Sequence, residues 1–374
     1  MSKYKILTVL GTRPELIRLS RCIEKLDINF KNILVHTNQN YNFELKDLFF
    51  KDLKIRKPDY ILKHKDKSTY GIIGEILKQI EKIIIKEAPD AFLVLGDTNS
   101  CLSAYVAKRY KIPIFHIEAG NRCFDTNVPE EINRRLIDHI ADLNIVYSSF
   151  AKQNLLNEGL PNQNIVIMGS PLYEVINYYQ EKINTQKILQ KYNVKKDFFF
   201  LMSFHREENL NNQKKIMGFI DIIYFLQKKF SLKILISVHP RTAKVLKKFR
   251  IANNKNTLFL KPFSFSEYLS LQTSAKLVIS DSGSLPEESS ILNFPAIIMR
   301  DNFERQEIME NSSVLLCPPQ LKYFKKALEI EFSKKNKKIS REHFEYKNED
   351  FSNDLSRVIY GHIQHINKYI WHKE

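Results

Sequence analysis

The side chains of this sequence that could transfer protons stand mostly at the ends of apolar runs. Asp97 follows "AFLVLG", Glu118 follows "IPIFHI", and His205 follows "FFFLMSF". Glu130, in "PEEINR", opens a segment with a helical pattern. Because carboxylates and imidazole are the usual general acids and bases of enzymes, these four residues are our candidate acid–base group.

Each of the four residues also has a structural interpretation, which the sequence leaves open. Asp97 could cap the helix that begins near "TNSCLSA", and His205 could be a hydrogen-bonded imidazole at the edge of the core. Glu130 or its neighbour Glu131 could simply face the positive end of a helix dipole. Glu118 fits such roles poorly, because a carboxylate that ends an apolar strand before Ala-Gly has no obvious helix to cap. Their expected convergence on one edge of the sheets favours a catalytic role for the group.

Two strand-to-helix turns of similar design, "GTRPE" and "SDSGSLPEES", offer a site for a diphosphate. We expect a capping box in each turn, formed by Thr12 with Glu15 and by Ser284 with Glu287. The unpaired N–H groups and the positive dipole end of a helix N-terminus bind phosphate groups. Arg13 would add a cationic fork to the first turn.

Further polar residues in the second half of the chain extend this candidate binding surface. Glu288 could accept hydrogen bonds from a ribose diol, although a helix dipole alone would also explain this carboxylate. The other candidates at strand ends are Ser282, Gly283, Ser284, His239, Arg241, Arg300 and Arg305.

The elements that must position these residues alternate between strand and helix along almost the whole chain. Continuous apolar runs between amphipathic segments predict parallel sheets covered on both faces, hence an α/β fold with two doubly wound units. We place the break near Gly169–Pro171, which gives domains at 1–169 and 170–353, with the helical segment 354–374 joining the first domain. The expected strands of the two halves are 4–10, 32–37, 91–97, 112–119, 144–148 and 164–169, then 198–205, 233–239, 257–262, 276–282, 296–300 and 314–317.

The chemistry-bearing residues should meet at one edge of each sheet. In open parallel sheets the ligand binds outside the carboxyl ends of the strands, which is where the acids, His205 and the two turns fall. If the two edges face each other, they line a single cleft between the domains. Such a cleft would hold a diphosphate beside proton-transferring groups.

Composition excludes several other classes of protein. The chain has 374 residues, 43% of them hydrophobic, and its net charge of +16 comes from lysines spread over helix-like segments beside acidic residues. This pattern indicates a solvated surface more than a nucleic-acid site. We find no signal peptide, membrane-spanning run or CxxC spacing, so we expect a cytoplasmic protein without disulfides. His116-Ile-Glu118 matches the H-x-E of zinc deaminases, but the partner P-C-x-x-C is absent, so we predict no metal.

Six motifs, in order and spacing, resemble the non-hydrolysing UDP-N-acetylglucosamine 2-epimerases. They are "GTRPE", "GDTNS", "HIEAGNR", "PEEINR", "FHREEN" and "SDSGSLPEES", and the resemblance covers nearly the whole chain. It implies a GT-B fold, in which two Rossmann-like domains face an interdomain cleft. Details such as "GNRCFD" and "SSILNFPA" resemble the branch that makes UDP-N-acetyl-L-fucosamine from UDP-2-acetamido-2,6-dideoxy-L-talose, for capsule or O-antigen synthesis.

The resemblance also implies a mechanism and a set of site residues. The family eliminates UDP as the C2 proton leaves and adds it back to a 2-acetamidoglycal, with no cofactor and no metal. The implied partner is a UDP-2-acetamido sugar, and the implied assembly is a homodimer. The implied catalytic residues are Asp97, Glu118, Glu130 and His205. The implied UDP contacts are Arg13, His205, Ser282, Gly283, Ser284, Glu288 and Arg305, and the implied sugar contacts are Arg122 and Arg206.

The sequence departs from the commoner family pattern and leaves the substrate open. Arg18 replaces the usual lysine after "GTRPE", the segment between Glu118 and Glu130 is shorter, and "QNYN" stands where a "QHR"-type allosteric motif is expected. The alternatives are a UDP-N-acetylglucosamine 2-epimerase, a UDP-2,3-diacetamido-uronic acid 2-epimerase and a GT-B glycosyltransferase. The glycosyltransferase would leave Asp97, Glu118 and Glu130 without a joint task. A further alternative is a nucleic-acid binder driven by charge, which would bind DNA in a strongly salt-dependent way and show no affinity for UDP.

Overall fold

The structure is a computed structural model that forms two compact units. Unit 1 comprises Met1–Tyr178 and Glu345–Glu374, and unit 2 comprises Tyr179–Phe344. The predicted domain boundaries at 169/170 and 353/354 stay predictions. The described residues are 3–39, 50, 52–238, 242–243, 246, 249, 254–310, 314–333 and 344–373. The candidates His239 and Arg241, and most of "QNYN", lie outside them.

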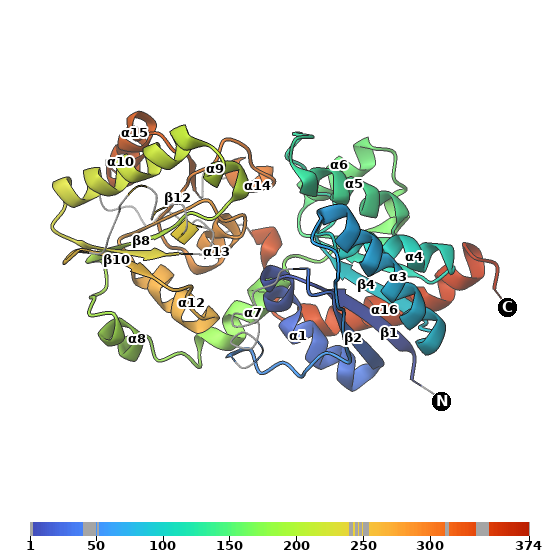
Figure 1. Cartoon of the computed structure of the whole chain (residues 1–374). Coiled ribbons are helices and arrows are strands. Elements are labelled where there is room, and N and C mark those ends of the chain that lie inside the picture. The colour runs from blue at the N-terminus through green and yellow to red at the C-terminus, as the bar shows by residue number, and fades with distance from the viewer. Residues whose placement is uncertain are drawn as a thin grey trace. The chain divides into compact units, whose positions relative to one another are not determined.

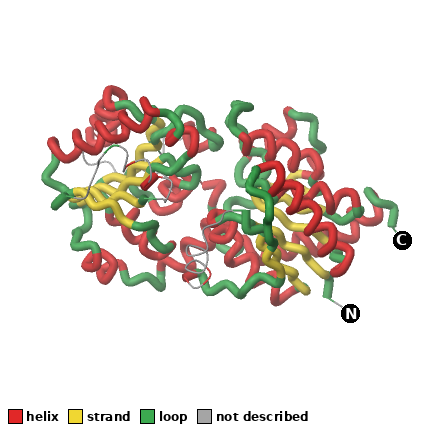
Figure 2. Tube along the Cα trace, viewed as in Figure 1, coloured by secondary structure: helices red, strands yellow, loops and turns green. Residues whose placement is uncertain are grey.

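Unit 1 is built on a parallel sheet of seven strands in the order β3-β2-β1-β4-β5-β6-β7. In Figure 2 the strands of each unit lie between helices, and most strand residues are buried. The chain order therefore reverses between β1 and β4, which is where a doubly wound sheet binds its ligand. The strands are β1 (Lys5–Leu10), β2 (Lys31–His36), β3 (Tyr60–Ile61), β4 (Ala91–Leu95), β5 (Ile114–Ile117), β6 (Leu143–Val146) and β7 (Ile165–Ile167).

The helices of unit 1 present one apolar face each to this sheet. In α3, isoleucines 72, 76, 80, 83 and 84 are buried in the core with strand residues of β1, β2 and β4, as expected for an amphipathic helix. The helices are α1 (Arg13–Asn29), α3 (Thr69–Glu87), α4 (Ala104–Arg109), α5 (Pro129–Ile140), α6 (Ser149–Asn157), α7 (Pro171–Gln180), which runs two residues into unit 2, and α16 (Phe351–Tyr369), with 3₁₀ turns at Cys101–Ser103, Asn162–Asn164 and Phe344–Tyr346.

Helix α16 returns from the far end of the sequence to cover unit 1. Leu355, Ile359, Ile363 and Ile366 form its buried stripe, and the helix packs beside α1 (Figure 1). Glu174 of α7 fixes the first turn of α16. Its carboxylate accepts hydrogen bonds from the backbone N–H and the hydroxyl of Ser352, both at 2.8 Å. Unit 1 is thus made of two segments that are distant in sequence.

Unit 2 repeats the design with a parallel sheet of six strands in the order β10-β9-β8-β11-β12-β13. Here the reversal of chain order lies between β8 and β11. The strands are β8 (Phe199–Ser203), β9 (Lys233–Ser237), β10 (Thr257–Leu260), β11 (Leu277–Ser280), β12 (Ala296–Ile298) and β13 (Leu315–Leu316). The helices are α8 (Thr185–Lys191), α9 (Glu207–Leu210), α10 (Gln213–Lys229), α12 (Phe265–Ser274), α13 (Leu285–Leu292), α14 (Gln306–Glu310) and α15 (Leu321–Ser333).

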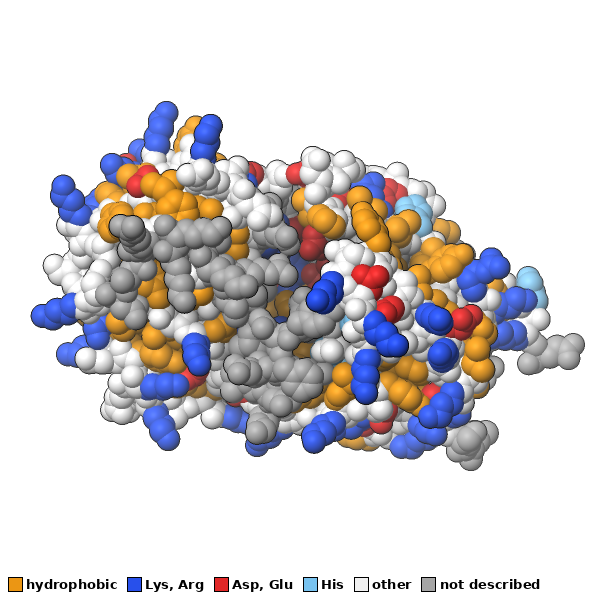
Figure 3. Space-filling view, in the orientation of Figure 1, with side chains coloured by type: hydrophobic (Ala, Val, Ile, Leu, Met, Phe, Trp, Pro, Cys, Tyr) orange, Lys and Arg blue, Asp and Glu red, His pale blue; other side chains and the backbone are white. Residues whose placement is uncertain are grey.

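The predicted fold class, two Rossmann-like doubly wound parallel sheets, is confirmed. Every predicted strand corresponds to an observed one. Strand β3 was missed because Tyr60 and Ile61 lie between charged segments, whereas the equally short β13 lies in the apolar run "VLLC". That the two ligand-binding edges face each other stays a prediction. No helix among the described residues is long and apolar enough to cross a membrane. On the face drawn in Figure 3, Lys and Arg side chains are scattered and do not form one basic patch.

Candidate active site

The turn after β1 brings the chain into close contact with the turn after β4. A Cβ atom added at Gly11 would lie 2.0 Å from the hydroxyl oxygen of Thr37 and 2.2 Å from that of Ser100. These two hydroxyls are themselves hydrogen-bonded at 2.7 Å. Only glycine fits at position 11. The turn that carries Arg13 therefore packs closely against the hydroxyl groups of Thr37 and Ser100. Arg13 is the first residue of α1 and is exposed.

Glu15 is the buried group that ties these turns together. Its carboxylate accepts hydrogen bonds from the backbone N–H groups of Gly11 at 3.0 Å and Thr12 at 2.6 Å, and from the hydroxyl of Thr98 at 2.9 Å. The Glu15 half of the predicted capping box is therefore present. Burial raises the pKa of Glu15 to about 7, although the hydrogen bonds oppose this shift.

We expect Glu15 to make the stability of the protein fall as the pH rises from about 4.5 to about 7. Because the folded-state pKa lies above the unfolded one, the folded protein binds more protons in this range. Relative to Glu15→Gln, which cannot ionise, the wild type should lose about 3 kcal/mol of unfolding free energy across it. Urea unfolding at several pH values measures this difference. Glu24→Gln, an exposed change on the same helix, is the control, and parallel curves for wild type and Glu15→Gln would contradict the assignment.

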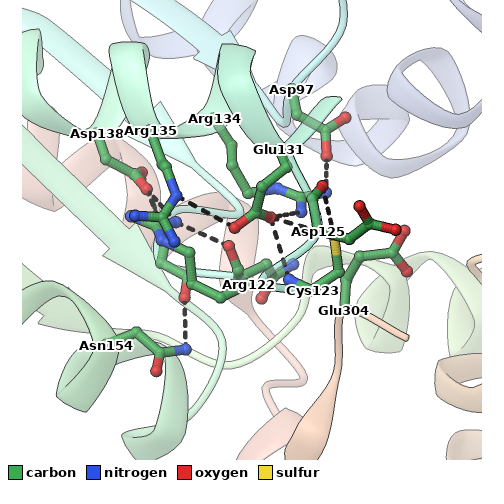
Figure 4. Close-up of polar contacts among 12 residues, drawn as sticks. Asp97, Arg122, Cys123, Asp125, Glu131, Arg134, Arg135, Asp138, Asn154 and Glu304 are labelled. Carbon is green, nitrogen blue, oxygen red and sulfur yellow. Dashed lines mark hydrogen bonds and ion pairs between the residues drawn. The ribbon is translucent and has the colours of Figure 1, made fainter. Parts of the chain in front are cut away.

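Asp97 follows β4 and forms an ion pair with Arg134 of α5, seen in Figure 4. The guanidinium of Arg134 is buried, whereas the Asp97 side chain remains 24% exposed. The amide of Asn133 donates to the Asp97 backbone oxygen at 2.9 Å. Asp97 is therefore anchored by α5 and still accessible, and the structure shows no helix cap by its side chain.

Glu118 follows β5 and has a backbone φ of 69°, in the left-handed region that a glutamate rarely adopts. Its carboxylate lies 3.6 Å from Nε of Arg18 and accepts a hydrogen bond from the hydroxyl of Tyr147 at 3.3 Å. The side chain is 15% exposed. Strained backbone often marks functional positions, so this geometry supports the interpretation of Glu118 as a proton-transfer residue.

The first turn of α5 separates the roles of two adjacent acids. Glu131 is fully buried and accepts hydrogen bonds from the backbone N–H of Cys123 at 3.0 Å and from Arg134 at 2.6 Å. Burial alone would raise its pKa, but these contacts hold it below the usual range. Figure 4 shows Glu131 at the centre of this cluster. Glu131 is thus a structural acid that fixes the loop before α5, while Glu130 is half-buried at the same turn.

Arg122, a predicted sugar contact, lies in a buried network of ion pairs. Its guanidinium is fully buried, binds both carboxylate oxygens of Glu158 at 2.6 and 2.8 Å, and donates to Asp138 at 2.7 Å. Asp138 also lies 3.0 Å from Nδ1 of His116, whose Nε2 is 2.9 Å from the Gly96 backbone oxygen. This burial argues against a sugar contact, and we leave Arg122 out of the proposed set. Both ring nitrogens of His116, the histidine of the H-x-E pattern, therefore contact groups of the protein itself.

In unit 2, His205 follows β8 at the reversal of strand order, and its side chain is 41% exposed. Its Nδ1 lies 3.1 Å from Asp281, the residue that follows β11. The turn after Asp281 carries Ser282 and Gly283, and a Cβ atom at Gly283 would lie 2.7 Å from the guanidinium of Arg206. The predicted UDP and sugar contacts of this edge are therefore grouped around one turn at the N-terminus of α13.

The predicted capping box of Ser284 with Glu287 is wrong. Ser284 occupies the N-cap position, but its side chain makes no capping hydrogen bond. The hydroxyl instead lies 3.0 Å from that of Ser282, and the carboxylate of Glu287 forms a buried ion pair with Arg305 at 3.0 Å. Arg305 competes successfully for Glu287 because a fully buried carboxylate needs a charged partner.

That ion pair also bears on the predicted UDP contact of Arg305. Both partners are buried, the side chain of Arg305 being only 3% exposed, so this arginine holds α13 in place. We therefore leave Arg305 out of the proposed set. Glu288, the predicted ribose contact, is 9% exposed and accepts a hydrogen bond from Gln272 at 2.5 Å. Arg206 is 23% exposed and lies 4.0 Å from Glu304, which binds Arg300 through both carboxylate oxygens.

Sequence reasoning missed four residues that shape these edges. Glu15 and Arg134 stand inside quoted motifs, but only the structure shows that they contact Thr98 and Asp97. Tyr147 directly follows β6, and an aromatic residue that continues a buried apolar run gives no sign of a polar contact. Asp281 follows β11, a position that the rule used for the other acids could have identified.

Comparisons with known proteins agree with this fold. A family model described as UDP-N-acetylglucosamine 2-epimerase matches residues 24–359. A curated UDP-N-acetylglucosamine 2-epimerase of Methanocaldococcus jannaschii is 36% identical over 344 residues, which is 88% of this chain and 93% of the relative. The structure of UDP-N-acetylglucosamine 2-epimerase from Rickettsia bellii is 39% identical, with a TM-score of 0.89 over 99% of this chain and 100% of that chain.

A third comparison adds a relative with bound ligands. The M. jannaschii UDP-GlcNAc 2-epimerase in complex with UDP-GlcNAc and UDP is 34% identical and has a TM-score of 0.87, over 96% of this chain and 99% of that chain. The two doubly wound parallel sheets and the family match together place the chain among the isomerases of the sugar-nucleotide epimerase class. The chain belongs to the UDP-N-acetylglucosamine 2-epimerase family, so the predicted family and enzyme class are confirmed. These relatives give no support to the finer placement in the fucosamine branch.

Proposed function

We propose that this protein inverts C2 of a UDP-2-acetamido sugar, and that UDP-GlcNAc and UDP-ManNAc are its substrate pair. The observation that carries the proposal is the relative in complex with UDP-GlcNAc and UDP, which matches this chain over almost its whole length. The chemistry of the site supports it, because Asp97 follows β4, Glu118 follows β5 and Glu130 lies in the first turn of α5, while a phosphate-type turn follows β11 of unit 2.

The proposed reaction divides between proton transfer and departure of UDP. One carboxylate removes the C2 proton, the electron pair of the C–H bond forms the C1–C2 double bond, and the C1–O bond breaks to release UDP. A second group then returns a proton to the other face of C2 as UDP adds back to C1. Asp97, Glu118 and Glu130 form the proposed acid–base set, since the first two are held by cations yet accessible.

Unit 2 supplies the proposed grip on UDP. His205 would assist the departure of the diphosphate, and the turn at Ser282, Gly283 and Ser284 would bind it through N–H groups at the start of α13. The further proposed contacts are Arg13 for the diphosphate, Glu288 for the ribose and Arg206 for the sugar. Gly283 allows a close approach because even a Cβ atom there would meet Arg206.

A second candidate is the epimerisation of UDP-2-acetamido-2,6-dideoxy-L-talose to UDP-N-acetyl-L-fucosamine. Two features of this chain favour it: Arg18, in place of the usual lysine, contacts the proposed base Glu118, and the segment between Glu118 and Glu130 is short. A homodimer, a cytoplasmic location and a role in capsule or O-antigen synthesis stay predictions.

Incubation with each UDP-sugar in deuterated water tests the proposal. We expect UDP-GlcNAc to yield UDP-ManNAc, with deuterium at C2 seen by NMR and mass spectrometry. Exchange restricted to the talose compound would favour the second candidate, and exchange restricted to the 2,3-diacetamido-uronic acid would favour that branch. Sugar transfer to an acceptor with no label at C2 would contradict epimerisation and support a glycosyltransferase.

A further inference from the structure

The contact between His205 and Asp281 has no part in the proposed catalytic and binding roles of the site residues. Asp281 is fully buried, and His205 reaches it across the switch point between β8 and β11. The Asp281 carboxylate accepts hydrogen bonds from the backbone N–H groups of His205 at 3.0 Å and Arg206 at 2.9 Å. The amide of Asn209 adds a third at 3.1 Å. The carboxylate is therefore fixed in place before it meets the imidazole.

Of the two described side chains that contact Asp281, the imidazole of His205 is partly exposed and the amide of Asn209 is buried. Nδ1 of His205 lies 3.1 Å from Oδ1 of Asp281, while the side chain of His205 is 41% exposed. A ring held at Nδ1 by a buried carboxylate directs its other nitrogen, Nε2, away from that carboxylate. The arrangement matches a common feature of enzyme active sites, in which a carboxylate, here Asp281, orients an imidazole, here His205. Although burial opposes it, the charge of His205 contributes to holding the pKa of Asp281 below its usual range, so this carboxylate is ionised.

We propose that Asp281 is a positioning residue that fixes the tautomer and orientation of His205, so that Nε2 serves the departing diphosphate. This inference rests on the proposed function, because His205 has a catalytic task only if UDP leaves. Asp281 touches neither substrate nor reacting atoms. Its negative charge would also stabilise the imidazolium that donates a hydrogen bond to the leaving oxygen.

Direct observation of the ring tests the inference without a substrate. In protein labelled with ¹⁵N-histidine, with the His205 signals assigned by comparison with His205→Gln, Nδ1 of His205 should carry a proton at every pH. A neutral ring protonated on Nε2 alone cannot donate to Asp281 and would overturn the proposal. This measurement uses the wild-type protein, so it does not depend on the folding of an Asp281 variant.

Kinetics of C2 exchange give the second test. Asp281→Asn should lower kcat by about 10- to 1,000-fold, with KM changed far less, because the ring is misoriented and substrate binding is kept. In the His205→Gln background the same substitution should cost little more, because residues that act through one another are not additive. If Asp281→Asn lowered kcat by the same factor in the His205→Gln background as in the wild type, Asp281 would act through the fold alone, and the inference would be wrong.

Controls separate this inference from the proposed function. Asp221→Asn, the same chemical change at an exposed position of α10, should leave kcat at the wild-type value. A wild-type protein that exchanges C2 of none of the UDP-sugars would end the proposed function, while the ring spectrum would still report whether Asp281 orients His205. Wild-type exchange with an unchanged kcat in folded Asp281→Asn would end the positioning role and leave the epimerase intact.

Discussion

Glu118→Gln should lower the rate of C2 exchange by about 100- to 10,000-fold, the range of general acid–base catalysis. The change keeps the size of the side chain and its contact with Tyr147, but the amide no longer accepts a proton. Because the φ of 69° is set by the turn after β5, glutamine should adopt the same backbone. The measurement is deuterium incorporation at C2 of the active UDP-sugar.

The binding of UDP distinguishes a chemical defect from a structural one in this variant. Since Glu118 is not among the proposed UDP contacts, the Kd of UDP measured by calorimetry should not change in Glu118→Gln. Glu81→Gln, an exposed change in α3 of the same unit, should keep wild-type exchange. Wild-type exchange in Glu118→Gln would remove this residue from the acid–base set and leave Asp97 and Glu130 as the candidates.

Asp138→Ala should lower the free energy of unfolding of unit 1 by about 3 kcal/mol, because it removes one of the two carboxylates that hold the buried guanidinium of Arg122 and leaves buried N–H groups without an acceptor. Asp138 contacts the guanidinium of Arg122 and the ring of His116, and it is within 3.3 Å of the backbone N–H of Gly120. All of these groups are buried. Urea unfolding followed by circular dichroism measures the loss.

A surface ion pair provides the comparison for this substitution. Glu24→Ala removes the partner of Arg21 on the outside of α1, where Glu24 is 54% exposed, and should cost at most about 1 kcal/mol. Similar losses for Asp138→Ala and Glu24→Ala would show that the Arg122 network contributes little. Asp138→Asn should fall between them, since it keeps hydrogen bonds and loses the charge.

The two sheets were predictable because buried parallel strands appear in the sequence as continuous apolar runs. The carboxyl ends of such runs lie on one edge, so Asp97, Glu118 and His205 could be located without any knowledge of side-chain contacts. Strand β3 was missed because Tyr60 and Ile61 stand between charged segments and form no long apolar run. The strand pairs with Val35 and His36 at the edge of the sheet.

The choice of partner by each charged residue was not predictable. Arg122 pairs with Glu158, 36 residues further along the chain, and Arg305, just before α14, pairs with Glu287 of α13. Local rules assigned Glu287 to the cap of its own helix, but a buried carboxylate takes a charged partner when the fold brings one close. The same limit left Glu130 and Glu131 equivalent in the sequence, although only Glu131 is fully buried.

The return of α16 to unit 1 has a consequence for synthesis of the chain. The ribosome produces unit 2 in full before Phe351–Tyr369 emerges, since this helix follows all of unit 2 in the sequence. Until then the face of α1 that α16 covers stays open to solvent, together with Glu174, which binds the first turn of the helix. The unit that begins first during translation is therefore the one completed last.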